Sequence, residues 1–185
     1  MLKLTATAIC LALALTGIAG CGNKSPEPKP LEQTSATDSA QPTSPPTLPP
    51  EVRQKNEAGV KATVEAFVEA RNFAGRTGDT SAFDALFTRE CNKCIGTSRI
   101  IQKTYNSGGY FRGADWVKKK MVFKGFENGV AFVELFVDTT PNSYKASGSS
   151  EVEKYDGSTN FIHFLQLTWG PDNQWRVSAL DPEIS

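Results

Sequence analysis

Four cysteines and a single histidine are the side chains best suited to covalent, redox or acid–base chemistry in this sequence. Cys21 ends the segment Ile18-Ala19-Gly20-Cys21, which follows an apolar run from Leu4 to Ile18. Small residues next to a cut suit a signal peptidase, and the thiol of the following cysteine is the nucleophile that accepts a diacylglycerol. This is the order of a bacterial lipoprotein leader. We therefore expect a signal peptide over residues 1–20 and lipid attachment at Cys21.

A membrane-spanning helix and an ordinary secretory signal are the alternatives for this leader. The apolar run is shorter than the ~20 residues that a spanning helix needs. An ordinary signal would also have a short apolar core, but two small residues followed by cysteine favour the lipoprotein. Acyl chains on Cys21 would hold the mature protein stably at the bilayer. We expect a lipid-anchored protein on the extracytoplasmic face of the cell membrane.

The spacing Cys91-Asn92-Lys93-Cys94 predicts a local disulfide. Cys10 leaves with the signal and Cys21 is lipidated. Cys91 and Cys94 are then the two cysteines left to pair with each other in an oxidising compartment. The alternative is a redox-active pair, because a helix N-terminus and Lys93 would lower the pKa of a thiol. No strand precedes the motif as it does in a thioredoxin-like unit, which favours the structural role. A zinc site needs four ligands and only His163 could join the two sulfurs, so we expect no metal and no cofactor.

His163 is the candidate general base. Alternate residues of its predicted strand are apolar and share its face: Phe161, Leu165, Leu167 and Trp169. Burial there would lower the pKa of the imidazole. The alternative, a core histidine with its hydrogen bonds satisfied, is favoured because no acid partner can be placed beside it. The available groups for a pocket are Tyr105, Tyr110 and Asp115, and no catalytic residue is assigned.

Composition divides the chain after the leader. Residues 22–50 hold eight of the eleven prolines and no aromatic residue, a composition that cannot bury enough surface to fold. We expect a lipidated, disordered tether over 21–50 and one globular domain over 51–185. Without Lys3 the mature chain carries nineteen basic and twenty acidic residues. This balance gives no electrostatic attraction for a nucleic acid.

Three helices are expected in the first half of the domain. Between Glu51 and about Ala74, one face repeats at intervals of three and four: Val60, Val64, Phe67, Val68, Arg71 and Ala74. Gly75 and Gly78 supply a stop, and Asp79 can cap a short second helix with an apolar stripe from Ala82 to Phe87. A third helix runs from the cysteine pair to about Asn106, where Gly108 and Gly109 end it.

The second half predicts antiparallel strands. Trp116–Phe126 and Val130–Val137 are joined through Asn128-Gly129, a strong hairpin signal. Val130–Val137 is apolar on both faces, which indicates a central strand. Further strands are expected over 144–155, over 160–169 and over 174–180.

This order predicts an α+β fold. A long N-terminal helix and two shorter helices pack on a curved antiparallel sheet of four or more strands. The arrangement resembles the nuclear transport factor 2-like cone fold, which many unrelated activities share.

A closer likeness lies in short motifs. These are Asn72-Phe73-Ala74 with Thr77-Gly78-Asp79, the C-x-x-C at 91–94, and Tyr105 followed by Gly108-Gly109 and Gly113. The chain resembles an uncharacterised family of actinobacterial lipoproteins, in which Tyr occupies the position of Phe73. The resemblance implies envelope location and architecture, and it carries no activity.

Three functions remain open. We favour a non-catalytic, tethered envelope module that binds a protein, a wall polymer or a lipid. The alternatives are a small-ligand pocket, with or without catalysis, and a thiol oxidoreductase using Cys91 and Cys94. The predicted loop from Gly108 to Gly113 is the candidate contact surface, because Tyr110 and Phe111 lie between its glycines. Packing of those rings under the sheet is the alternative.

Overall fold

The computed structural model describes residues 44–181, all within one compact unit, Ser39–Ser185. The predicted leader, Cys21 and most of the predicted tether lie outside the described residues, so the three domain boundaries stay predictions. Between residues 44 and 181, no helix combines the length and the apolar character needed to cross a membrane.

Residues 44–181 form three α-helices and two antiparallel sheets, which confirms the α+β class. The helices are α1 (Glu57–Thr77), α2 (Ser81–Asp84) and α3 (Asn92–Asn106), preceded by a 3-10 turn, η1 (Pro50–Arg53). The expected α1 face is buried, with Val60, Val64 and Phe67 fully excluded from solvent. The stripe predicted for the second helix is only partly helical, because α2 ends before Leu86.

The predicted start of the first helix at Glu51 is wrong. The chain turns after η1, and α1 begins only after Asn56, whose side-chain oxygen accepts a hydrogen bond from the Gly59 amide at 3.1 Å. Such a cap satisfies one of the free amides in the first helical turn. Gly59 permits the turn, because a Cβ there would lie 1.9 Å from the carbonyl oxygen of Gln54.

The larger sheet contains four strands in the order β2-β3-β6-β7. Their bounds are β2 Trp116–Glu127, β3 Val130–Thr139, β6 Ser158–Trp169 and β7 Trp175–Leu180. The β2–β3 hairpin and the central position of β3 are confirmed. Asn128 and Gly129 both have positive φ, 50° and 81°, as the expected tight turn requires.

A second sheet departs from the prediction. It has the order β1-β4-β5, built from β1 (Tyr110–Gly113), β4 (Asn142–Lys145) and β5 (Val152–Tyr155). The single strand expected over 144–155 is therefore two strands, and four of the six residues of the expected contact loop form a strand. Gly109 and Gly113 allow this close pairing, since a Cβ on either would lie 2.1 Å from a carbonyl oxygen of the β4 segment.

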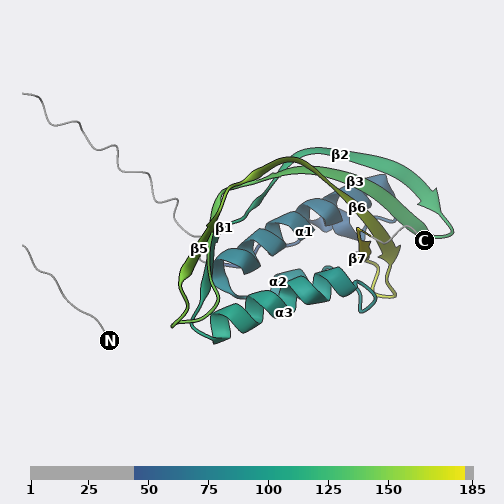
Figure 1. The fold of residues 1–185 in the computed structure, drawn as a ribbon. Coiled ribbons are helices and arrows are strands. Elements are labelled where there is room, and N and C mark those ends of the chain that lie inside the picture. Colours follow the sequence, from purple (N-terminus) through teal and green to yellow (C-terminus); the bar gives the residue numbers. More distant parts are fainter. Residues whose placement is uncertain (1–43, 182–185) are drawn as a thin grey trace, which may run out of the picture. The chain divides into compact units, whose positions relative to one another are not determined.

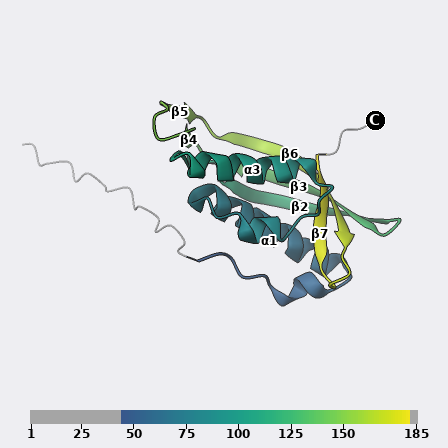
Figure 2. The same ribbon diagram turned by 90° about the horizontal axis from the view of Figure 1, so that it is seen from below.

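The four-stranded sheet curves over the helices. Figure 1 shows β2, β3 and β6 arching across α1 and α3, with β1 and β5 at one end and β7 at the other. Figure 2 shows α1 and α3 side by side on one face of the sheet. That face carries the buried side chains of β3, namely Ala131, Val133, Leu135 and Val137.

Asn72 joins α1 to the first residue of β2. Its side-chain amide donates to the carbonyl of Trp116, and its side-chain oxygen accepts from the amide of Trp116, both at 2.9 Å. The neighbouring Arg71 donates from Nη1 to the carbonyl of Ala114 at 2.6 Å. Two adjacent helical residues thus hold the corner between the two sheets.

Removing the Asn72 amide should destabilise the domain. We expect Asn72→Ala to lower the free energy of unfolding by about 1–3 kcal/mol, because two buried backbone groups of Trp116 lose their partner. Urea denaturation measures the change. Asn106→Ala is the control, since Asn106 is exposed at the end of α3 and should shift stability by no more than about 0.5 kcal/mol. Equal effects of the two substitutions would contradict the assigned role of Asn72.

Candidate functional site

A pocket of about 450 Å³ lies between α1, α3 and the three-stranded sheet. We call it the Arg71 pocket. Its wall is mostly apolar and includes two charged side chains. The lining residues are Arg71, Gly75, Thr97, Ile100, Ile101, Phe111, Gly113, Ala114, Asp115, Asn142, Tyr144 and Tyr155.

Arg71 brings a positive charge into this wall. The side chain is half-buried, and its guanidinium lies over the Trp116 ring at 4.6 Å from the ring centroid. Burial lowers the pKa of Arg71 to about 10, against the opposing effect of nearby Asp115. Arg71 therefore stays protonated at neutral pH. Its Nη1 donates to Ala114 and, at 3.2 Å, to the side-chain oxygen of Asn72.

Asp115 also lines the Arg71 pocket, and its charge is engaged by the protein. Oδ2 accepts from Nη1 of Arg76 at 2.9 Å, and both side chains are partly buried. Sequence reasoning offered Asp115 as a partner for His163. The structure pairs it with Arg76 instead.

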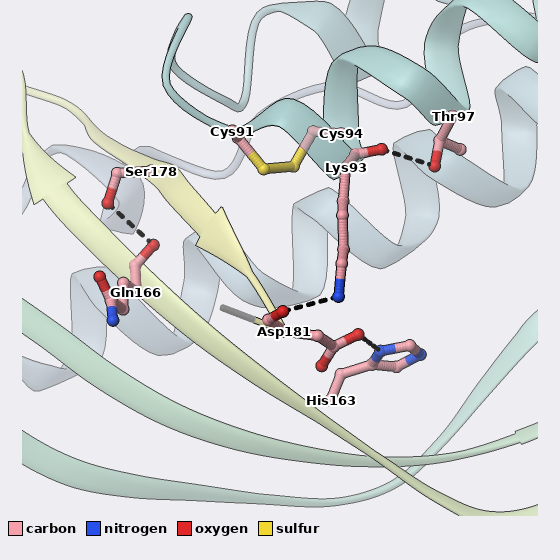
Figure 3. Close-up of a disulfide and its surroundings, with 8 residues drawn as sticks. All are labelled: Cys91, Lys93, Cys94, Thr97, His163, Gln166, Ser178 and Asp181. Atoms are coloured by element: carbon pink, nitrogen blue, oxygen red, sulfur yellow. Dashed lines mark hydrogen bonds and ion pairs between the residues drawn. A yellow bond between two sulfur atoms is a disulfide. The ribbon is translucent and has the colours of Figure 1, made fainter. Parts of the chain in front are cut away.

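His163 has an acid partner that sequence reasoning missed. Its Nδ1 lies 2.7 Å from Oδ2 of Asp181. Figure 3 shows the two side chains pointing toward each other. The other oxygen of Asp181 accepts from the Phe164 amide at 2.8 Å, and the Asp181 amide donates back to the Phe164 carbonyl. Because a carboxylate can only accept, Nδ1 carries the hydrogen.

The surroundings of His163 are partly as expected. The side chain is 8% exposed, and its ring stacks on Trp116 with 4.0 Å between centroids. Burial lowers the pKa of His163, and the hydrogen bond to Asp181 offsets this only in part. Phe161 lies beside it as expected, with 4.8 Å between the ring centroids, but the expected burial of Phe161 is wrong, because this residue is 51% exposed. His163 and Asp181 do not line the Arg71 pocket.

The three aromatic residues predicted to form a pocket or contact surface, Tyr105, Tyr110 and Phe111, lie in different surroundings. Phe111 lines the pocket and stacks on Tyr144 at 4.9 Å between centroids. The Tyr105 hydroxyl donates to the Gly75 carbonyl at 2.8 Å, and burial raises its pKa. Tyr110 lies outside the pocket lining, under the Arg112 guanidinium at 4.5 Å. The expected exposed aromatic loop is therefore a strand whose Phe111 faces a cavity.

Cys91 and Cys94 form the predicted disulfide at the start of α3. Both residues are buried, with 1% and 0% exposure. Lys93 between them extends to the end of β7, where its Nζ donates to the Asp181 carbonyl at 2.6 Å (Figure 3). The C-x-x-C segment thus fixes α3 against the strand end that holds the partner of His163.

Two further features concern other ligands. Within residues 44–181, no group of three or more His, Cys, Asp or Glu side chains is arranged to hold a metal ion. A hollow of about 570 Å³ lies on the sheet face opposite the helices, and two of its three charged residues, Lys124 and Glu134, pair with each other at 3.1 Å.

The fold and pocket define a small α+β domain in which α1, α3 and the three-stranded sheet line a mostly apolar cavity. The chain belongs to a family described as "Family of unknown function (DUF6318)", whose match spans residues 31–181. This confirms the expected membership of an uncharacterised family.

Other comparisons add little. A crystal structure from Novosphingobium aromaticivorans, provisionally described as an aromatic ring hydroxylase, is 12% identical. The similarity covers 75% of this chain and 94% of that chain, with a TM-score of 0.44. No curated protein matches the chain.

The lowered pKa of His163 predicts an acid-sensitive fold. In the unfolded chain its pKa is about 6.5, so between about pH 7 and pH 5 the unfolded state binds more protons than the folded state. The free energy of unfolding should therefore fall as the pH is lowered through this range. Four carboxylates have lowered pKa values and titrate below it: Asp79, Glu90, Asp138 and Asp172.

His163→Asn isolates this contribution, because His163 is the single histidine of the chain. Urea denaturation at pH 7 and pH 5 should show a smaller pH dependence in the variant than in the parent protein. An unchanged pH dependence would show that His163 does not cause it.

Proposed function

We propose that this protein is a lipid-anchored extracytoplasmic lipoprotein whose globular domain is a non-catalytic module that binds a small molecule in the Arg71 pocket. The leader, the small residues before Cys21 and the proline-rich segment support the anchor and the tether. The same features, with the motifs at 91–94 and 105–113, support the likeness to actinobacterial lipoproteins. A curved sheet over a long helix supports a likeness to the nuclear transport factor 2-like cone.

The observation that carries the binding function is the Arg71 pocket itself. Ligand sites are typically concave, mostly apolar, and contain a few polar groups that orient the ligand. The pocket has this character, with apolar residues from α3 and the second sheet and a guanidinium from α1. Its volume of about 450 Å³ is in the range of small-molecule sites.

The two chemical alternatives are less well supported. A general base must reach the proton that it abstracts, and His163 with Asp181 does not line the pocket. Thiol–disulfide exchange requires access of a thiolate to a sulfur, whereas Cys91 and Cys94 are buried. The buried disulfide and the His163–Asp181 pair suit roles in holding the fold.

The anchor predicts a measurable lipid. Mature protein isolated from the membrane fraction should begin at Cys21 and carry a mass increment of two or three acyl chains. Cys21→Ala should shift the protein out of the membrane fraction, because the acyl chains supply the attachment. Intact-mass spectrometry and fractionation measure both. An unmodified first residue in the membrane-bound protein would contradict the anchor.

Filling the pocket should abolish binding without unfolding the domain. Gly75 lines the pocket, and a Cβ there would meet no atom within 4 Å. We expect Gly75→Phe to fold and to lose binding of phenylnaphthylamine, an uncharged apolar fluorophore, measured by fluorescence titration. Replacing this helical glycine by phenylalanine should also gain roughly 0.3–0.5 kcal/mol of stability.

Gly96→Phe is the matched control. Gly96 is a helical glycine on α3 whose Cβ would also meet no atom within 4 Å, and it does not line the pocket. It should bind the fluorophore like the parent protein. Retained binding in Gly75→Phe, or equal loss in both variants, would contradict binding in the Arg71 pocket.

A further inference from the structure

We infer that the ligand of the Arg71 pocket is a monocarboxylate with an apolar body, whose carboxylate binds the guanidinium of Arg71. The inference rests on the proposed function and names the class of ligand. It follows from the charges in the pocket wall, from the unused donors of Arg71, and from the residues that line the rest of the cavity.

One positive charge is left over where α1 meets the corner between the sheets. Arg71 and Asp115 line the pocket there, and Arg76, which pairs with Asp115, lies outside the lining. The single carboxylate is held by Arg76 at 2.9 Å. Arg71 forms no ion pair with any residue in the described part of the chain, 44–181. A half-buried charge whose nearby carboxylate, Asp115, is bonded to another arginine is only partly compensated, and a bound anion would stabilise it.

The guanidinium has donors available for such an anion. It carries five N–H groups, and the bonds seen within residues 44–181 all use Nη1. Nε and Nη2 have no acceptor there. A planar carboxylate accepts two parallel bonds from a guanidinium, which makes it the preferred partner of an arginine held in one orientation. The contacts to Ala114 and Trp116 hold Arg71 in this way.

The remainder of the cavity suits an apolar body. Ile101 and Phe111 are buried or half-buried in its wall, next to Tyr144. Ile100 and Tyr155, which are 56% and 50% exposed, form an apolar rim. The Tyr155 hydroxyl is bonded to Glu153, which places a negative charge beside the rim. A carboxylate is therefore favoured at Arg71 and disfavoured at the rim.

Two pairs of probes test this inference on the full mature chain carrying Cys21→Ala, which needs no detergent. One pair is octanoate and octanamide, and the other is naphthylacetate and naphthylacetamide. Each pair has one shape and differs in charge. Isothermal titration should show that the acid binds at least about tenfold more tightly than the amide, the scale of a charge-assisted bond. The pair that binds more tightly shows whether the body is aliphatic or aromatic.

Variants of Arg71 locate the preference. Arg71→Met should bind acid and amide with equal affinity, and Arg71→Lys should keep part of the preference. Arg99→Met is the matched control, because Arg99 is an exposed arginine of α3 outside the pocket. It should keep the full preference. A role of Arg71 in folding alone would lower the stability of Arg71→Met without changing the ratio of the two affinities.

The outcomes separate this inference from the proposed function. Equal binding of acid and amide by the parent chain, or a preference that persists in Arg71→Met, overturns the carboxylate while the pocket remains a binding site. Absence of binding for all probes, with no effect of Gly75→Phe on phenylnaphthylamine, overturns the binding function itself. If Arg71→Met does not fold, the parent chain and Gly75→Phe still test the inference. An acid preference in the parent chain that Gly75→Phe abolishes supports it. Equal binding of acid and amide by the parent chain overturns it.

Discussion

The contact between two adjacent residues of α1 and the corner preceding β2 is the constraint on which the rest of the domain depends. Arg71 and Asn72 hold the backbone from Ala114 to Trp116 through three short hydrogen bonds. The backbone here is unusual, since Gly113 and Ala114 both have positive φ, 81° and 62°. For alanine this conformation is disfavoured by sterics. The side chains of α1 stabilise it, and the corner lets one chain leave the small sheet and enter the large one.

This corner also sets the electrostatics of the pocket. Because Nη1 of Arg71 binds backbone and amide oxygens, the guanidinium is positioned without being neutralised. Asp115, the next residue after the corner, is turned toward Arg76. Folding therefore produces a fixed cation beside an apolar cavity. The Trp116 ring lies under the Arg71 guanidinium and also stacks on the His163 ring. The corner and the His163–Asp181 pair therefore support each other.

Local sequence signals were sufficient for much of the fold. The apolar spacing of α1 and the Asn128-Gly129 turn each act within a few residues, and both predictions are confirmed. The predictions fail where contacts between segments that are distant in the sequence determine the local structure. Whether Tyr110–Gly113 is a loop or a strand depends on the β4 backbone, which approaches because Gly109 and Gly113 lack side chains. The sequence predicts a helix end and a loop at these glycines, whereas in the structure they permit close contact between strands.

The site follows the same division. His163 was identifiable as a titratable group on an apolar strand face, but its partner Asp181 belongs to the end of another strand. Their contact depends on the β6–β7 register, which pairs Leu165 with Leu180. Arg71 left a clearer signal, because periodicity places it among the buried residues of α1. A cation on a buried stripe must be compensated, either by an acid of the fold or by a ligand. Asp115 is the acid nearest in the wall, and it is already paired. The irregularity in the helical pattern therefore indicates the proposed binding site more directly than the C-x-x-C motif, whose sulfurs are enclosed in the core.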